Sequence, residues 1–248
     1  MLLYGICPLS VVPVRAEAND TSEMVTQLLY GDHFEITKIR PKWIKIRIAF
    51  DSYEGWIDEK QAFKIDDLTF QNLQEKSTYS TDLISLMTTS SSQLIPVCLG
   101  SAVHASKLLS HDFDGSTNVD YNKIQLVDTA TLYLNSPYLW GGKSPFGIDC
   151  SGFTQMVYKI NLIQLHRDAY QQAKQGQALS FIEESESGDL AFFDNEEGQI
   201  IHVGIMMKDN YIIHAHGQVR IDRIDHLGIF NEDTNRYSHT LRVIKKIV

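Results

Sequence analysis

The sequence predicts an α+β protein in which short β-strands come first and a mixture of helices and antiparallel strands follows. Residues 1–65 show strand periodicity: in Trp43–Ile48 the isoleucines alternate with Trp43, Lys45 and Arg47, as expected of a half-buried strand. From residue 120 the apolar residues recur at helical spacing, and strand-like segments follow them. The chain has 248 residues, 43% of them hydrophobic, which is enough for one or two domains with a buried core.

The first 65 residues contain several candidate strands separated by tight turns. A first strand is expected within 1–8, and others at 33–36, 43–48 and 55–57. Short strands with little helix in so few residues favour a small barrel. In residues 66–119 polar clusters interrupt apolar fragments, and we expect a degenerate second barrel or an elaborated linker.

Residues 120–248 are expected to form one α+β domain. A helix is predicted from Asp120 and before Pro137, with its apolar positions at Ile124, Val127, Leu132 and Leu134. A second helix should begin at Cys150. Strands are predicted at 188–193, 200–207, 211–215 and 241–244.

Charge and cysteine content exclude several classes of protein. The net charge is −9, from 22 basic and 31 acidic residues, so neither nucleic acid nor an anionic membrane is an expected partner. Three widely spaced cysteines suggest neither a disulfide framework nor a metal site, and no cofactor is implied. No apolar run approaches the roughly 18 residues of a membrane span.

The start of the chain favours a cytoplasmic location. Its apolar run lacks a basic region before it and is broken by Gly5 and Pro8, unlike a signal peptide. A start site assigned too late would instead permit the periplasm or the cell envelope.

Cys150 follows a glycine-rich loop and lies at the start of a predicted helix. Asp149 is a good N-cap, and Phe153, Val157 and Ile160 mark an apolar stripe at helical spacing. In a first helical turn the helix dipole and unpaired amides favour a thiolate and can bind an oxyanion. The alternative is a buried structural cysteine.

Three histidines follow at even positions of two adjacent strands, namely His202, His214 and His216. A connection of three or five residues around Lys208–Asn210 would bring all three to one face of the sheet. One imidazole could then orient another, as a thiol nucleophile and its base require. The alternative is that His202 is an ordinary sheet histidine between apolar neighbours.

In combination, Tyr138-Leu-Trp-Gly-Gly142, Asp149-Cys-Ser-Gly-Phe153, His202-Val-Gly-Ile205 and Tyr211-Ile-Ile-His214 resemble the NlpC family of bacterial cell-wall cysteine peptidases, which have a papain-like fold. The similarity covers about residues 120–248. It implies Cys150 as nucleophile, His202 as base and His214, instead of His216, as the orienting third residue. It also implies that residues 1–65 form an SH3-like bacterial barrel.

The resemblance further implies a substrate, a murein stem peptide whose γ-D-glutamyl bond to a diamino acid is cleaved. In family members of this specificity, an aspartate in the segment matching Arg167–Gln172 binds the free amine of an N-terminal L-alanine, and Asp168 matches it. A serine commonly follows, but this chain has Ala169. Further amine contacts come from the barrel, where Glu23 and Tyr53 are the candidates; the alternative is ordinary surface.

Asp149, Ser151 and Trp140 complete the set of candidate substrate-binding residues. The alternatives are a helix-capping hydroxyl for Ser151 and a core position for Trp140. Competing functions are a general NlpC-type endopeptidase, an amidase or acyltransferase on the same scaffold, and a non-catalytic wall-binding protein. A phosphate-binding loop ending at Ser144 is excluded because its first glycine would fall on Pro137.

Overall fold

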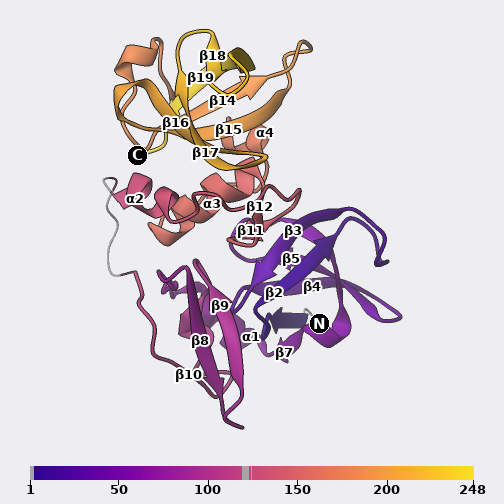
Figure 1. Ribbon diagram of the computed structural model, residues 1–248. Coiled ribbons are helices and arrows are strands. Elements are labelled where there is room, and N and C mark those ends of the chain that lie inside the picture. Colours follow the sequence, from indigo (N-terminus) through magenta and orange to yellow (C-terminus); the bar gives the residue numbers. More distant parts are fainter. Residues whose placement is uncertain (1–2, 119–122, 124) are drawn as a thin grey trace. The chain divides into compact units, whose positions relative to one another are not determined.

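The computed structural model describes residues 3–118, 123 and 125–248, which form two compact units (Figure 1). The first unit comprises Met1–Asp120 and Trp140–Pro145, and the second comprises Tyr121–Leu139 and Phe146–Val248. The domain boundaries after residues 65 and 119 stay predictions.

The first unit is built on a seven-stranded antiparallel sheet with the order β3-β2-β6-β5-β4-β1-β7. The strands expected at 33–36, 43–48 and 55–57 are confirmed, and the first begins at Leu3, since Met1 and Leu2 lie outside the described residues. The strands are β1 (Leu3–Ile6), β2 (Val11–Arg15), β3 (Met24–Leu29), β4 (His33–Arg40), β5 (Trp43–Ile48), β6 (Glu54–Asp58) and β7 (Phe63–Ile65).

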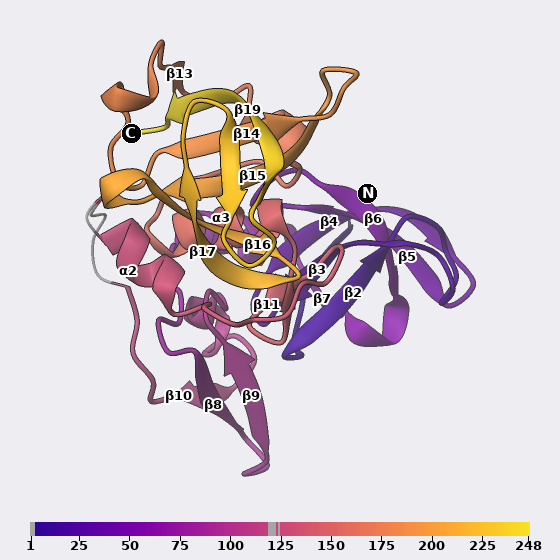
Figure 2. The same ribbon diagram turned by 45° about the horizontal axis from the view of Figure 1, so that its top comes forward.

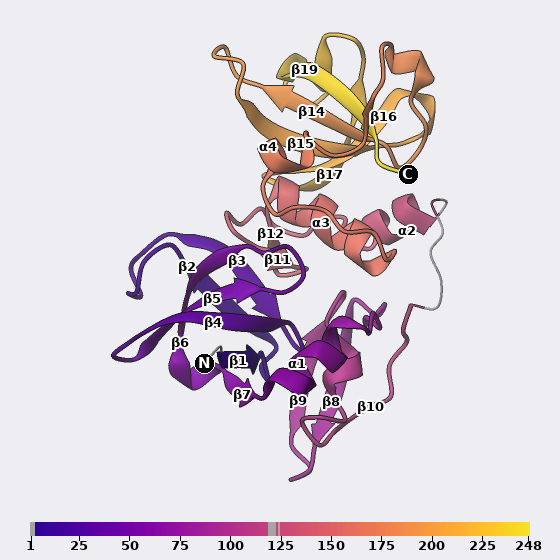
Figure 3. The same cartoon turned by 180° about the vertical axis from the view of Figure 1, so that it is seen from behind.

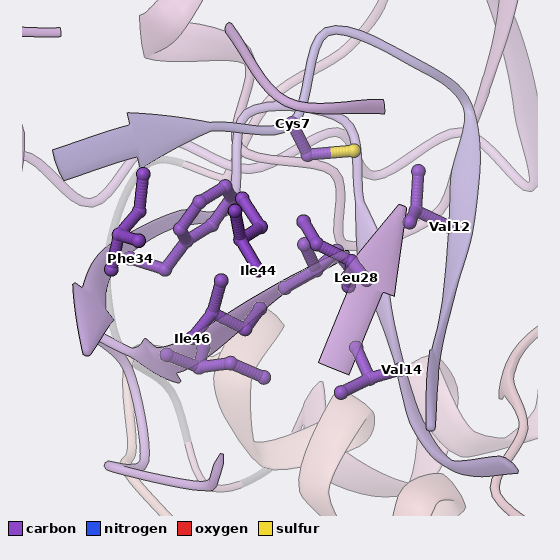
Figure 4. Close-up of a cluster of buried hydrophobic side chains, with 10 residues drawn as sticks. Cys7, Val12, Val14, Leu28, Phe34, Ile44 and Ile46 are labelled. Carbon is purple, nitrogen blue, oxygen red and sulfur yellow. The ribbon is translucent and has the colours of Figure 1, made fainter. Parts of the chain in front are cut away.

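Apolar side chains that alternate with polar ones along these strands form the barrel core. Phe34 lies opposite Ile48 and Ile36 opposite Ile46, so every second residue of β5 and of the first half of β4 points inward. Figure 4 shows Phe34 and Ile46 together with Val12, Val14 and Leu28 around one apolar interior, and Ile36 and Ile48 belong to the same cluster. Gly55 is required beside this core, because a Cβ at that position would meet the Val14 side chain at 2.4 Å.

The rest of the first unit has its own small sheet. Residues 84–113 form a three-stranded antiparallel sheet in the order β10-β8-β9, which packs around Tyr30 and Met87. The elements are α1 (Asp67–Gln74), β8 (Ile84–Thr89), β9 (Leu94–Cys98), β10 (His111–Phe113) and, after residue 140, β11 (Lys143–Ser144).

The second unit contains a seven-stranded sheet in the order β13-β19-β14-β15-β16-β17-β18 (Figure 2). β19 also pairs with β18, so the sheet curls back on itself. The four predicted strands are confirmed, whereas β17 and β18 were not predicted. The strands are β12 (Gly147–Ile148), β13 (Gln177–Ala178), β14 (Leu190–Asp194), β15 (Ile200–Met206), β16 (Tyr211–His216), β17 (Gln218–Ile224), β18 (Gly228–Asn231) and β19 (Arg236–Lys246).

Three helices accompany this sheet: α2 (Gln125–Thr131), α3 (Cys150–Ile160) and α4 (Ala169–Gln172). The predicted helix start at Asp120 and its position Ile124 lie outside the described residues. The prediction was wrong at the other end, because α2 ends at Thr131 and both Leu132 and Leu134 are exposed beyond it. All residues of α3 are buried, and the helix packs against β15, β16 and α2, with α2 and α3 on the same side of the sheet (Figure 3). Among the described residues, no helix is long and apolar enough to cross a membrane.

Candidate active site

Cys150 is the first residue of α3, as the sequence predicts. The Asp149 carboxylate caps the helix by accepting a hydrogen bond from the Gly152 amide at 2.6 Å. Cys150 is only 7% exposed, and the backbone amide of Val203 lies close enough to its sulfur to influence the thiol pKa. The nucleophile candidate therefore lies beside β15, next to the residue that follows His202.

The connection between β15 and β16 confirms the predicted register. The Met207 amide donates to the Tyr211 carbonyl, which leaves the three residues Lys208–Asn210 in the turn. Gly204 lies opposite His214, so even-numbered residues of both strands share a face. The imidazole rings of His202, His214 and His216 consequently gather on that face.

A chain of hydrogen bonds runs across the sheet from His202. His202 Nε2 and His214 Nδ1 are 2.8 Å apart, and His214 Nε2 is 2.9 Å from Asp222 Oδ2. His202, His214 and Asp222 are all buried. His216 is exposed and meets His202 through ring contact, with centroids 6.4 Å apart. This geometry suits His214 to the orienting role that the family resemblance implies.

Burial opposes the resting thiolate that the start of a helix favours. Burial, followed by the nearby Asp149 carboxylate, raises the pKa of the Cys150 thiol to about 12, although the Val203 amide and Arg167 act in the opposite direction. Burial and the neighbouring imidazoles hold the pKa of His202 well below its usual value. Burial therefore opposes the charged form of both groups in the resting site.

His239 is a neighbour of the site that sequence reasoning missed. Its ring stacks on His202 with centroids 4.1 Å apart and planes 21° apart. Burial lowers the pKa of His239 to about 3, so the stacked ring is also neutral. The missing signal was the length of β19, which begins at Arg236, five residues before the predicted strand.

Asp222 was missed for a related reason, since β17 was not predicted. The tight turn at Gly217 pairs His216 with Gln218 and His214 with Arg220, so the even positions of β17 continue the histidine face. Extending the parity argument through that turn would have found Asp222.

Asp149 and Ser151, two predicted substrate-binding residues, have side chains in an internal network. Arg167 Nη2 lies 2.6 Å from Asp149 Oδ2, and Arg167 Nη1 donates to Asp149 Oδ1 and to Ser151 Oγ, both at 3.0 Å. The guanidinium is buried. A paired, hydrogen-bonded buried charge is tolerated where an isolated one is not. This network fixes the residues on both sides of Cys150.

Asp168 is half-buried at the start of α4. The α4 residue Gln172 donates from Nε2 to the Ser151 carbonyl at 3.0 Å and accepts from the Thr154 hydroxyl at 2.7 Å. Asp168 therefore belongs to a segment that is anchored to the first turn of α3.

The remaining candidates lie in the first unit. Glu23 Oε1 accepts a hydrogen bond from Trp140 Nε1 at 2.6 Å, and the Trp140 ring is 62% exposed instead of lying in the core. Tyr53 packs against the barrel core while half-buried. Their roles toward substrate stay predictions. Within the described part of the chain, no group of three or more His, Cys, Asp or Glu side chains is arranged to hold a metal ion.

Comparison with known proteins assigns a family to each unit. Residues 135–237 match the NlpC/P60 family, and residues 14–61 match the bacterial dipeptidyl-peptidase SH3 domain. The chain carries an NlpC/P60 cysteine peptidase domain preceded by a bacterial SH3 domain. The predicted papain-like α+β fold with an SH3-like barrel is thereby confirmed.

Relatives of this NlpC/P60 peptidase resemble most of its length. The γ-D-glutamyl-L-lysine dipeptidyl-peptidase of Bacillus cereus is 28% identical over 235 residues, covering 79% of this chain and 68% of the relative. Dipeptidyl-peptidase 6 of Lysinibacillus sphaericus is 28% identical over 251 residues, covering 85% and 88%. The crystal structure of an NlpC/P60 family protein from Bacillus cereus shares the fold, with a TM-score of 0.75 at 19% identity, over 98% of this chain and 99% of that one.

Gly204 is predicted to be essential to the site, because a Cβ there would meet the His214 Cβ at 2.8 Å and Ile212 Cδ1 at 2.7 Å. In Gly204→Ala, β16 must shift and displace His214. Since a misplacement of about 1 Å can cost about 100-fold, peptidase kcat/KM should fall by one to two orders of magnitude. The control is Gly198→Asn, at a position with open space and a positive φ that asparagine tolerates. Wild-type kinetics in Gly204→Ala would contradict the packing argument.

The buried histidines are predicted to make the peptidase unit labile to acid. The folded pKa values of His202, His214 and His239 lie below the usual 6.5, so the unfolded chain binds protons that the folded chain does not as the pH falls below 6.5. For each histidine, the free energy of unfolding falls by up to about 1.4 kcal/mol for every unit by which the pH drops below 6.5. For His239 this decrease extends down to about pH 3.

His239→Gln should therefore have a shallower dependence of unfolding free energy on pH than wild type below pH 6.5. Urea unfolding followed by circular dichroism, repeated from neutral pH to about pH 4, measures the difference, which should be up to about 1.4 kcal/mol per pH unit. Equal slopes for the two proteins would show that His239 is not held neutral by the fold.

Proposed function

We propose that this cysteine peptidase hydrolyses the bond between γ-D-glutamate and the diamino acid of murein stem peptides that have a free N-terminal L-alanine. The product would be L-Ala-D-Glu, and the setting would be recycling of cell-wall peptides. The observation that carries the proposal is that relatives named for this activity are similar over both the barrel and the peptidase domain. We further propose the cytoplasm as its location, with the periplasm or envelope as the alternative.

The geometry suits acyl transfer from a neutral resting state. As Cys150 Sγ attacks the γ-carbonyl carbon, its proton moves to His202, and His202 then passes that proton to the departing amine of the diamino acid. The oxyanion can be met by the Cys150 amide at the start of α3. Burial and the nearby Cys150 raise the pKa of Tyr138, so its hydroxyl keeps its proton and can donate as well. Water then hydrolyses the thioester and restores the thiol.

Asp168 supports recognition of a free amino terminus. Asp168 is half-buried, and the hydrogen bonds of Gln172 with Ser151 and Thr154 tie α4 to the start of α3, which fixes Asp168 relative to Cys150. A carboxylate at a fixed distance from the nucleophile selects an ammonium group at a fixed distance from the scissile bond. An acetylated or longer stem would leave that carboxylate without its substrate partner.

The test is hydrolysis of L-Ala-γ-D-Glu-diamino acid tripeptides, free or N-acetylated, followed by mass spectrometry of the products. Removing one partner of a buried ion pair costs about 3–5 kcal/mol when the pair is fully enclosed and less when water reaches it. N-acetylation, which removes the substrate ammonium, should therefore lower kcat/KM by about two to three orders of magnitude. Asp168→Asn should reduce turnover of the free tripeptide by a similar factor and hardly change that of the acetylated one.

Cysteine variants provide the matched controls. Cys150→Ala should abolish hydrolysis, whereas Cys7→Ser and Cys98→Ser, at buried positions in the first unit, should retain most of it. Equal rates on free and acetylated tripeptide would contradict the amine specificity and indicate a general NlpC-type endopeptidase.

A further inference from the structure

A buried carboxylate on β17 continues the hydrogen-bonded chain beyond His214. Asp222 is 4% exposed, and its Oδ2 lies 2.9 Å from His214 Nε2. His214 is fully buried, and its other ring nitrogen, Nδ1, faces His202 Nε2 at 2.8 Å. Both nitrogens of His214 thus have partners, one the Asp222 carboxylate and the other the His202 imidazole.

The charge of Asp222 is maintained by its partners. Arg220 Nη2 donates to Asp222 Oδ1 at 2.8 Å, and Arg220 Nε lies 2.7 Å from Oδ2. Burial acts to raise the pKa of Asp222, but the hydrogen bonds from His214 and Arg220 outweigh it and lower the pKa overall. At neutral pH Asp222 is therefore an anion, and an ionised carboxylate can only accept hydrogen bonds.

An acceptor at this position determines where the protons lie on both imidazoles. His214 must carry its proton on Nε2 in order to donate to Asp222, which leaves a lone pair on Nδ1. That lone pair accepts from His202, so His202 carries its proton on Nε2. Nδ1 of His202 is then the nitrogen with a lone pair, ready to take the thiol proton.

We propose that Asp222 is a positioning residue of the peptidase, which fixes the tautomers of His214 and His202 so that His202 can act as base toward Cys150. Its effect passes through two imidazoles and requires no contact with substrate. The proposal rests on the peptidase activity of the Cys150 site and not on the identity of the stem peptide.

The informative variant is Asp222→Asn, which keeps the size of the side chain. An asparagine can donate from its amide to His214 Nε2, which would move the His214 proton to Nδ1 and the His202 proton to the nitrogen needed for catalysis. Loss of the correct tautomer in a directly bonded aspartate-histidine pair costs about 10⁴-fold in kcat. With one more imidazole between, kcat should fall by about 10²-fold, with KM changed by less than about threefold.

Asp233→Asn is the matched control. Asp233 accepts from the same Arg220 Nη2 at 2.8 Å, but its side chain is largely exposed and lies one step farther from His214. The same chemical change there should leave kcat within about twofold of wild type. A loss of kcat in Asp222→Asn that Asp233→Asn reproduces would assign the effect to Arg220 and overturn the proposal.

Two measurements do not depend on the substrate. Alkylation of Cys150 by iodoacetamide at neutral pH should be about tenfold slower or more in Asp222→Asn than in Asp233→Asn, because proton transfer to His202 is impaired. In wild-type protein with ¹⁵N-labelled histidine, the nitrogen spectrum should show Nε2–H tautomers for both His202 and His214. A proton on Nδ1 of either ring, or alkylation at the wild-type rate in a folded Asp222→Asn protein, would overturn the role of Asp222, whereas failure on the tripeptide alone would overturn only the proposed substrate.

Discussion

The hydrogen bond between His202 and His214 is the contact on which the organisation of the site depends. It forms only if β15 and β16 pair with even residues opposite even residues, which the three-residue turn Lys208–Asn210 imposes. Gly204 then allows the two backbones to approach where His214 projects. A slip of one residue would send one imidazole to the opposite face of the sheet and leave it buried without its partner.

Burial decides the charge state of this pair. Relative to the usual thiol, raising the pKa of Cys150 from 9.0 to about 12 corresponds to about 4 kcal/mol against the thiolate. A helix N-terminus contributes about 0.3–1 kcal/mol in its favour, and up to about 2 kcal/mol in a partly buried site, so desolvation exceeds the dipole. Without substrate, the site therefore provides a neutral base, His202, for the Cys150 proton and does not hold a preformed thiolate–imidazolium pair. Proton transfer from Cys150 to His202 then accompanies the attack on the substrate carbonyl.

The sequence was sufficient where local patterns determine structure. Alternation predicted β5, the capping residue Asp149 predicted the start of α3, and parity predicted the shared face of His202 and His214. These features depend on neighbours within a few residues. The residue motifs, taken together, also gave the family, which the comparison with known proteins confirms.

The features of the site that could not be predicted depend on contacts between residues that are distant in the sequence. Arg167 meets Asp149 across 18 positions, and His239 reaches His202 because β19 runs on past the predicted strand to pair with β18. The burial that opposes a Cys150 thiolate was not predicted, because every residue of α3 is buried and its contacts with α2, β15 and β16 come from distant parts of the sequence. Helical periodicity in the sequence indicates one apolar face and not this degree of burial.

The central claim, that the fold keeps Cys150 and His202 neutral before substrate binds, is tested most directly by the ultraviolet absorbance of the thiolate as a function of pH. The difference between wild type and Cys150→Ser isolates this cysteine. We expect no thiolate signal from Cys150 at neutral pH. The signal should appear only in the strongly alkaline range, as expected of a thiol whose pKa burial raises to about 12. A thiolate signal at neutral pH that disappears in His202→Ala would instead show a resting ion pair between Cys150 and His202, and the two groups would then not be neutral before substrate binds.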